Sequence, residues 1–260
     1  MEIRTPSEIA IEIVLSVQEY TILAWNAVAN IFRKPRYLAD TLMQADSIGV
    51  GSLPVVVLAG ASIGAVLALQ TSNTLQRFGS LSLTGQLVSL SMVRELGAVI
   101  SGLMVAGRNA SGIASELGTM KVTEQIDAMR ALGTDPLKKL VTPRVIAATI
   151  MLFFLTIIAD LVGLGGGWLI SRFALGLDSN QYWTTAWQSL EFADVFMGLT
   201  KPLLFGFMIS TVGCYYGLSA QGGTQGVGRA TTQAMVSSSV MILMVDFFYT
   251  KLLMTLMNVH

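Results

Sequence analysis

Long apolar stretches alternate with short polar connections along most of the chain. A bilayer core about 30 Å thick is crossed by about 20 mainly apolar residues in a helix, and five stretches meet that requirement. The second of them carries two adjacent charged residues, Arg94 and Glu95. The pattern predicts an all-α integral membrane protein whose five transmembrane helices lie at residues 48–70, 88–106, 145–170, 196–217 and 234–257.

Residues 8–33 follow a different pattern. Their polar residues recur at three- and four-residue steps or multiples of them, and so form one narrow stripe on a helix: Glu8, Glu12, Glu19, Asn26, Asn30 and Arg33. A helix with a polar stripe and a wide apolar face is typical of the membrane surface or of the outside of a bundle. We therefore expect an N-terminal interfacial helix, with a sixth span as the alternative.

The connection at residues 107–144 is long for a loop and short for a domain. Thr123, Glu124 and Gln125 resemble a helix start near Val122, and Gly133 is a typical helix stop. The apolar residues between them share one face: Ile126, Met129 and Leu132. This pattern predicts a short amphipathic helix between spans 2 and 3.

Positive residues are unevenly divided between the two sides of the predicted bundle. Eleven fall on one side: Arg4, Arg33, Lys34, Arg36, Arg108, Lys121, Arg130, Lys138, Lys139, Arg144 and Arg229. The other side carries Arg77 and Arg172, with Lys251 near the end of the last span. Lys and Arg are retained in cytoplasmic connections, so the N-terminus and the 107–144 segment are expected in the cytoplasm and the C-terminus in the periplasm.

Composition narrows the function classes. The 260 residues are 53% apolar and 12% charged, whereas a soluble domain carries about 25% charged residues. The formal net charge of zero gives no indication of nucleic-acid binding. The single cysteine, Cys214, and the single histidine, His260, offer no metal site. No phosphate-binding GxxxxGK[ST] pattern and no Ser/His/Asp or HExxH arrangement occurs, so we expect a non-catalytic chain.

Ionisable residues inside spans are costly and suggest function. Arg94, Asp160, Lys201 and Asp246 all lie roughly 18–24 Å from the cytoplasmic ends of their spans, and Glu95 is next to Arg94. Their opposite charges can neutralise one another. They either lock the helices together or form a polar belt at the outer end of a cavity.

The inner halves of the spans lack the chain of polar groups that a hydrophilic solute needs, which favours a lipid-like cargo. Two other functions stay open. One is an ion-coupled secondary transporter of a hydrophobic solute, with Asp160, Asp246 and Glu95 as the relay. The other is a membrane scaffold in which the charges are purely structural.

Four strings carry a family resemblance: RELG at 94–97, AGRNASGIASELGTM at 106–120, TEQIDAMRALGTDPLKKLVTPR at 123–144 and VGRATTQAMVSSS at 227–239. They resemble the MlaE (YrbE) permease family, the membrane subunit of MCE-linked ABC transporters that move phospholipids between the bacterial inner and outer membranes. The resemblance runs over almost the whole chain and implies a single permease domain, residues 1–260, in the inner membrane.

The resemblance also implies an assembly. Its members would be a homodimer of this chain, an MlaF-type ATPase that binds ATP and Mg, an MlaB-type STAS protein and a periplasmic hexamer of MlaD-type MCE subunits. No cofactor is implied in the chain itself. The system would maintain the lipid asymmetry of the outer membrane.

Residue roles follow from the same resemblance. Residues of the short helix would couple the chain to the ATPase: Glu124, Gln125, Ile126, Asp127, Met129, Arg130 and Leu132. The intramembrane charged cluster would consist of Arg94, Glu95, Lys201 and Asp246, with no family role for Asp160. Leu67, Leu75 and Phe78 would line the lipid cavity.

Overall fold

The chain is a bundle of long helices in a computed structural model that describes residues 6–31, 33–35 and 37–257, without the side chains of 6–10, 12 and 13. It contains no strand in these ranges. Five helices are long and apolar enough to cross a membrane: Leu38–Arg77, Leu81–Val122, Leu137–Phe173, Phe192–Leu218 and Gly223–Met257. Each contains one predicted span, so the predicted all-α membrane fold is confirmed.

Three of these helices are α2 (Leu38–Arg77), α9 (Phe192–Leu218) and α10 (Gly223–Met257). The second span begins with a 3₁₀ turn and contains two π-helical turns. Its segments are η1 (Leu81–Leu83), α3 (Thr84–Ser91), η2 (Met92–Leu96), α4 (Gly97–Val105), η3 (Ala106–Ala110) and α5 (Ser111–Val122). The third consists of the π turn η4 (Leu137–Val141) followed by α7 (Thr142–Phe173).

Most of the 107–144 connection belongs to the helices of the second and third spans, although its polar residues had indicated a separate segment. Residues 111–122 continue the second span as α5, and residues 137–144 already belong to the third. Only the short helix α6 (Gln125–Ala131) and its flanking turns lie between them. The reason is that one face of α5, with the buried Ile113, Ala114 and Leu117, packs against α9 and α10, so the helix continues after the apolar stretch ends.

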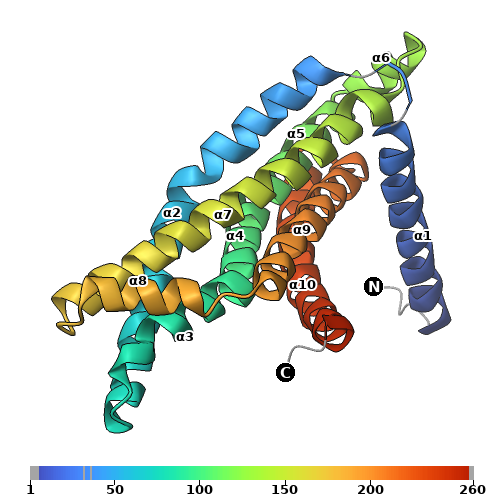
Figure 1. The fold of residues 1–260 in the computed structure, drawn as a ribbon. Helices are drawn as coiled ribbons and strands as arrows, with labels where there is room; N and C mark the ends of the chain where they lie inside the picture. The colour runs from blue at the N-terminus through green and yellow to red at the C-terminus, as the bar shows by residue number, and fades with distance from the viewer. Residues whose placement is uncertain (1–5, 32, 36, 258–260) are drawn as a thin grey trace.

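Figure 1 shows α2 and α7 side by side along most of their length. α4 contacts both of them, α9 packs against α7, and α10 packs against α9 and α5. Glycines set the distance between α2 and α7. A Cβ added to Gly64 would lie 1.9 Å from the Gly163 carbonyl oxygen, and one added to Gly60 would lie 2.9 Å from the Ala159 oxygen. The two backbones therefore touch, as the small residues at these positions permit in membrane helices.

Several polar side chains inside the bundle bond to one another or to the backbone. The hydroxyl oxygens of Ser101 on α4 and Thr156 on α7 lie 2.6 Å apart, and both residues are fully buried. Tyr182 on α8 (Ser179–Gln188) donates to the Leu164 carbonyl at 3.1 Å. Burial raises the pKa of Tyr182, so its phenol stays protonated and remains a donor at neutral pH.

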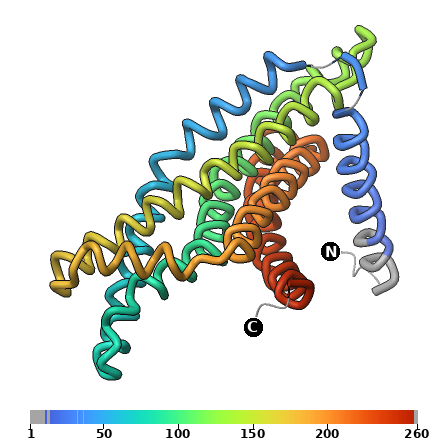
Figure 2. The backbone as a smooth tube through the Cα atoms, in the orientation of Figure 1, coloured from blue at the N-terminus to red at the C-terminus, as the bar shows by residue number. Residues whose placement is uncertain are grey.

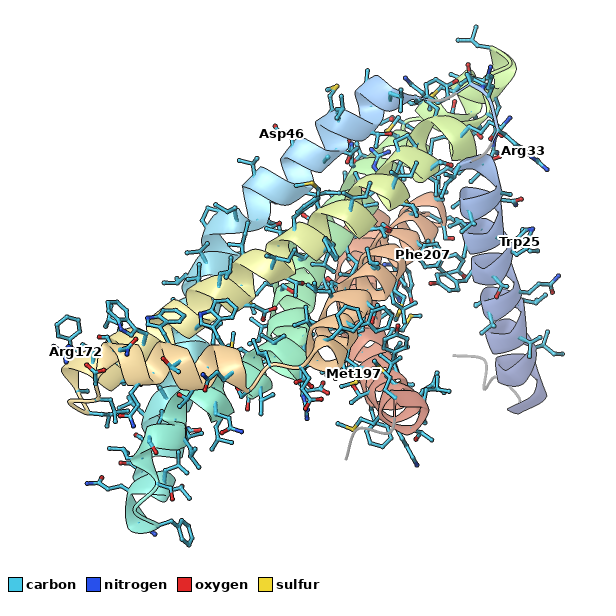
Figure 3. The ribbon with its side chains drawn as sticks, viewed as in Figure 1. Trp25, Arg33, Asp46, Arg172, Met197 and Phe207 are labelled. Atoms are coloured by element: carbon cyan, nitrogen blue, oxygen red, sulfur yellow. The ribbon has the colours of Figure 1, made fainter. Side chains whose placement is uncertain are left out.

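The N-terminal helix α1 (Pro6–Ile31) packs against α9 and the start of the third span and leaves much of its surface exposed (Figure 1). Its contacts include the buried Ala27 and a hydrogen bond between the hydroxyls of Tyr20 and Thr211, whose oxygens are 2.9 Å apart. Trp25 points away from the bundle in Figure 3 and is 73% exposed. The side chains of Glu8 and Glu12 lie outside the described residues, and the interfacial position of this helix stays a prediction.

The two ends of the molecule differ in structure. Figure 2 shows the end of α2 and the start of the second span as a hairpin that projects beyond α8. Figure 3 places Arg33 near α6 and Arg172 at the opposite end. The hydroxyl of Ser89 on α3 donates to the Ala186 carbonyl of α8 at 2.9 Å, which attaches α8 to the hairpin end.

The contact between α2 and α7 can be tested with two alanine variants. Gly64→Ala is expected to lower the free energy of unfolding by about 1–3 kcal/mol, because the added methyl collides with the Gly163 backbone. Gly165→Ala, on α7, has open space around the new methyl and should be neutral or stabilising. Thermal unfolding in detergent measures both, and equal stability of the two variants would contradict the proposed packing.

Candidate functional site

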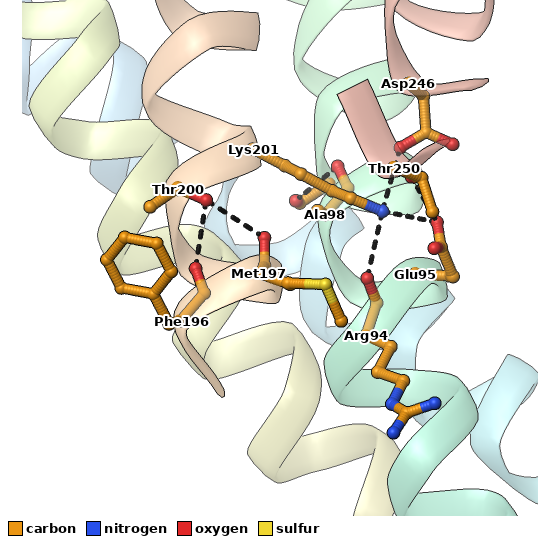
Figure 4. Close-up of polar contacts among 10 residues, drawn as sticks. Arg94, Glu95, Ala98, Phe196, Met197, Thr200, Lys201, Asp246 and Thr250 are labelled. Carbon is orange, nitrogen blue, oxygen red and sulfur yellow. Dashed lines mark hydrogen bonds and ion pairs between the residues drawn. The ribbon is translucent and has the colours of Figure 1, made fainter. Parts of the chain in front are cut away.

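Lys201 of α9 is the centre of a charged group inside the bundle (Figure 4). Its side chain is fully buried and forms ion pairs with Glu95 of η2 and with Asp246 of α10, the latter at 3.1 Å. Thr250 of α10 donates to Glu95 at 3.4 Å. Lys201, Glu95 and Asp246, here called the Lys201 cluster, join three spans through one ammonium group.

The π-helical turn Met92–Leu96 helps to position the Lys201 ammonium group. A π turn interrupts the regular i→i−4 ladder, and such turns are frequent at functional sites. Here the Arg94 carbonyl accepts a hydrogen bond from Lys201 Nζ at 3.0 Å. On α9, one turn before Lys201, a Cβ on Gly198 would lie 1.9 Å from the Val93 carbonyl oxygen. The absence of a side chain at Gly198 therefore lets α9 approach the turn closely enough for Lys201 to reach it.

Arg94 points away from the Lys201 cluster. Its Nε binds Asp194 Oδ1 at 2.5 Å, and the Asp194 side chain is 1% exposed. Asp194 Oδ2 also accepts from the Glu191 backbone N–H at 3.0 Å, in a reciprocal capping arrangement at the start of α9. The residues expected in one intramembrane charged cluster thus form two separate groups, one around Lys201 and one in which the Arg94 side chain pairs with Asp194.

The sequence did not identify Asp194 as a site residue, because it precedes the apolar stretch at 196–217. The signal that could have found it is the spacing of Glu191 and Asp194, since an acceptor followed three residues later by a second acceptor is typical of a helix start. The helix begins at Phe192 for this reason, four residues before the predicted span.

Asp160 of α7 joins neither group. Its side chain lies against α4, where a Cβ on Gly97 would come 1.7 Å from Asp160 Oδ1. It enters no ion pair within the described part of the chain, and Oδ1 has no hydrogen-bond partner there. The sequence expectation that Asp160 helps to neutralise the other intramembrane charges is therefore wrong.

A groove opens beside the Lys201 cluster on the outer face of α10. It has a volume of about 440 Å³ and is lined by Glu95 and by residues of α10: Asp246, Phe247, Thr250, Lys251, Met254 and Thr255. We call it the α10 groove. Phe247 is 63% exposed and Leu243, one turn earlier, is 53% exposed. The groove therefore places the apolar side chains of Phe247 and Met254 beside charged and hydroxyl groups, on a helix that its own chain leaves largely uncovered.

The three residues expected in a lipid cavity lie elsewhere in the single chain. Leu67 packs against Ala68, Val88, Met92 and Leu164 inside the bundle. Leu75 and Phe78 are at the projecting end of α2, and Phe78 is 77% exposed. None of the three lines the α10 groove.

The predicted short helix exists, but it begins at Gln125 rather than near Val122. The Thr123 hydroxyl donates back to the Thr119 carbonyl at 2.8 Å, so Thr123 completes α5 instead of starting α6. Glu124 follows in the left-handed region with φ 59°, which reverses the chain. The stop at Gly133, with φ 78°, is confirmed.

One face of α6 is anchored and the other is free. Ile126 is fully buried among Leu117, Leu140 and Val141, and Met129 packs partly against the same cluster. Leu132 is 83% exposed. On the outer side, Asp127 binds both cations nearby, Lys121 at 3.1 Å and Arg130 at 3.3 Å, and Gln125 donates to the Thr123 hydroxyl at 3.1 Å. The helix is held firmly while its polar face stays accessible.

Removing the ammonium of the Lys201 cluster should be strongly destabilising. Lys201→Met leaves Glu95 and Asp246 without their cation, so the free energy of unfolding is expected to fall by about 3–5 kcal/mol. The exposed Lys251→Met serves as the matched control and should change stability little. If thermal unfolding in detergent shows the same stability for both variants, the cluster does not hold the spans together.

Comparison with known proteins identifies the family to which the chain is similar. The model of the family "Permease MlaE" matches residues 41–252. A probable ABC transporter permease protein of Rickettsia typhi is 45% identical over 92% of this chain and 92% of its own length. The chloroplastic protein TRIGALACTOSYLDIACYLGLYCEROL 1 of Arabidopsis thaliana is 37% identical over 87% of this chain and 65% of its own length.

A further relative is the intermembrane phospholipid transport system permease protein MlaE of Haemophilus influenzae, 34% identical over 81% of each chain. The family match includes every residue of the Lys201 cluster, Asp194 and the whole of α6. The chain therefore belongs to the MlaE permease family of ABC transporter permeases.

Proposed function

We propose that this chain is the permease subunit of an ABC transporter that moves phospholipids between the inner and outer membranes and so maintains outer-membrane lipid asymmetry. The observation that carries the proposal is the α10 groove, where the apolar side chains of Phe247 and Met254 lie beside Glu95 and Asp246 of the Lys201 cluster. A phospholipid has both characters, acyl chains and a charged headgroup. The printed name of the Haemophilus influenzae relative supports the same cargo.

A second copy of the chain would complete the cavity. Along α10, large apolar side chains face outward from the bundle: Val236, Val240, Leu243, Met244, Phe247 and Phe248. A homodimer that met near this face would enclose the two α10 grooves between the copies. In such a dimer, the projecting Leu75 and Phe78 would be the residues able to reach the cavity from the outer end.

The energy source would be a separate MlaF-type ATPase. The sequence contains no phosphate-binding loop, so ATP and Mg would be bound by that partner and no cofactor by this chain. The accessible face of α6, with Leu132 and the Asp127 ion pairs, would be its docking surface. Since Ile126 fixes α6 to the second and third spans, a push on α6 would be transmitted to the helices that carry Glu95 and Asp160.

The remaining assembly follows from the family. An MlaB-type STAS protein would accompany the ATPase, and an MlaD-type MCE hexamer would receive or deliver lipid at the opposite end. The chain would sit in the bacterial inner membrane with the N-terminus and α6 in the cytoplasm and the C-terminus in the periplasm. The basic residues near α6, including Arg33 in Figure 3, support this orientation.

An ion-coupled transporter is less consistent with the geometry. Lys201 neutralises Glu95 and Asp246, and Asp160 lies on a different contact, against Gly97. The three carboxylates of the expected relay therefore do not form a connected chain in the described structure.

Docking at α6 is tested by changing Leu132, the exposed apolar residue that directly follows this helix. Leu132→Ser is expected to reduce co-purification of the ATPase subunit at least tenfold while the permease still folds, because the residue is 83% exposed and supports no internal packing. Phe173→Ser, 77% exposed at the other end of the molecule, is the matched control. Undiminished ATPase capture by the Leu132 variant would remove α6 from the interface.

The Lys201 cluster is tested by removing all of its charges together. The triple variant Lys201→Met, Glu95→Gln, Asp246→Asn leaves no unpaired charge and should recover most of the stability that Lys201→Met loses. We expect it to fold, to bind the ATPase and yet to transfer fluorescent phospholipid at least tenfold more slowly between vesicles with ATP. Transfer at the unchanged rate would mean that the cluster only joins the helices.

A further inference from the structure

A second concave site lies at the other end of the molecule from the α10 groove. It is bounded by the end of α1, the connection to α2, the start of α2 and the start of the third span, and has a volume of about 300 Å³. We call it the elbow pocket. Its polar lining consists of Asn30, Tyr37, Thr41, Lys138 and Thr142. None of these residues belongs to the Lys201 cluster or to α6.

The elbow pocket carries a lysine for which the described residues provide no ion-pair partner. Lys138 is the charged residue of the lining, is half-buried, and enters no ion pair among the residues that the structure describes. The neighbouring Lys139 is occupied, because it binds Asp40 at 2.5 Å and lies 4.5 Å from the centre of the Tyr37 ring. Asp40 is thus paired with Lys139, and the nearby Asp135 accepts a hydrogen bond from the Leu137 backbone N–H at 2.9 Å. Neither carboxylate forms an ion pair with Lys138 in the described structure, so its ammonium is available for an external anion.

The rim of the pocket adds to this charge. The lining residues Ile31 and Pro35 border a connection that contains Arg33 and Lys34, both exposed. Basic residues at the cytoplasmic end of spans attract anionic lipids with about 1 kcal/mol each, and basic pockets between spans bind their headgroups.

The other walls of the pocket are apolar. Leu38, Pro143 and Ile146 line it together with Ile31, and Leu38 is 67% exposed. A free phosphate ion has no apolar part that could pack against these walls. The glycerol and the first acyl carbons of a phospholipid can pack there. The combination of one uncompensated lysine, polar side chains and an apolar side is the chemistry of a lipid headgroup site at the membrane surface.

We propose that the elbow pocket binds the headgroup phosphate of an anionic phospholipid from the leaflet at the α6 end, with Lys138 as its counter-ion. This lipid is not the transported one, because the pocket shares no residue with the α10 groove. It would hold α1 against the third span. Leu137, Leu140 and Val141 pack in one cluster with Ala27 of α1 and Ile126 of α6, so the lipid would also brace the base of α6.

The test is lipid binding to the full chain in detergent, followed by native mass spectrometry. Phosphatidylglycerol should bind to the wild type more tightly than phosphatidylcholine, and Lys138→Gln should weaken phosphatidylglycerol binding about fivefold. Lys138→Arg keeps the charge and should retain binding. Arg172→Gln removes the same charge at the opposite end, outside both pockets, and should bind as the wild type does.

A second variant tests the shape of the pocket without changing charge. Ile146→Trp fills the apolar wall and should displace phosphatidylglycerol, while thermal unfolding without lipid verifies that both variants are folded. Equal phosphatidylglycerol binding by Lys138→Gln and the wild type, in folded protein, would overturn the proposal. Competition by millimolar glycerol phosphate as effective as by phosphatidylglycerol would overturn the lipid assignment and leave a site for soluble phosphate.

Discussion

The burial of one ammonium group in an apolar bundle is the constraint on which much of this structure depends. A lysine without access to water is tolerated only when its charge is met by carboxylates and its N–H groups by acceptors. Lys201 meets both requirements with Glu95, Asp246 and the Arg94 carbonyl. Because these partners come from the second and fifth spans, the charge requirement determines which helices surround α9 and at what height.

Close backbone contact makes the arrangement possible. Gly198 lets α9 reach the π turn that carries Glu95, and Gly60 and Gly64 do the same for α2 against α7. Apolar burial does not drive helices together within lipid as it does in water, so short contacts and buried polar pairs provide much of the specificity. The charged group and the glycines therefore act together: the glycines bring the backbones near, and the ion pairs select one register.

Other parts of the molecule are left incomplete by the chain itself. The outer face of α10 carries exposed phenylalanines beside a charged groove, and α6 presents an accessible face on a rigidly packed base. Exposed apolar surfaces of this kind are typical of sites that contact another protein or lipid. The elbow pocket differs from both, since its chemistry fits the membrane itself rather than a protein partner.

The sequence alone determined the helical membrane fold, the five spans and the short helix that Gly133 stops, because these depend on local hydrophobicity, helix propensity and turn chemistry. It also identified Lys201, Glu95 and Asp246 as costly and therefore notable. Tertiary structure decided the pairing: Arg94 turns to Asp194, Asp160 stays apart, and Leu67 packs inside the bundle while Phe78 projects outward. The depth of a residue along a span can be counted from the sequence. Which neighbour its side chain faces depends on the rotation of the helix and on π turns such as Met92–Leu96. Helix rotation and π turns are set by packing between segments about a hundred residues apart in the chain.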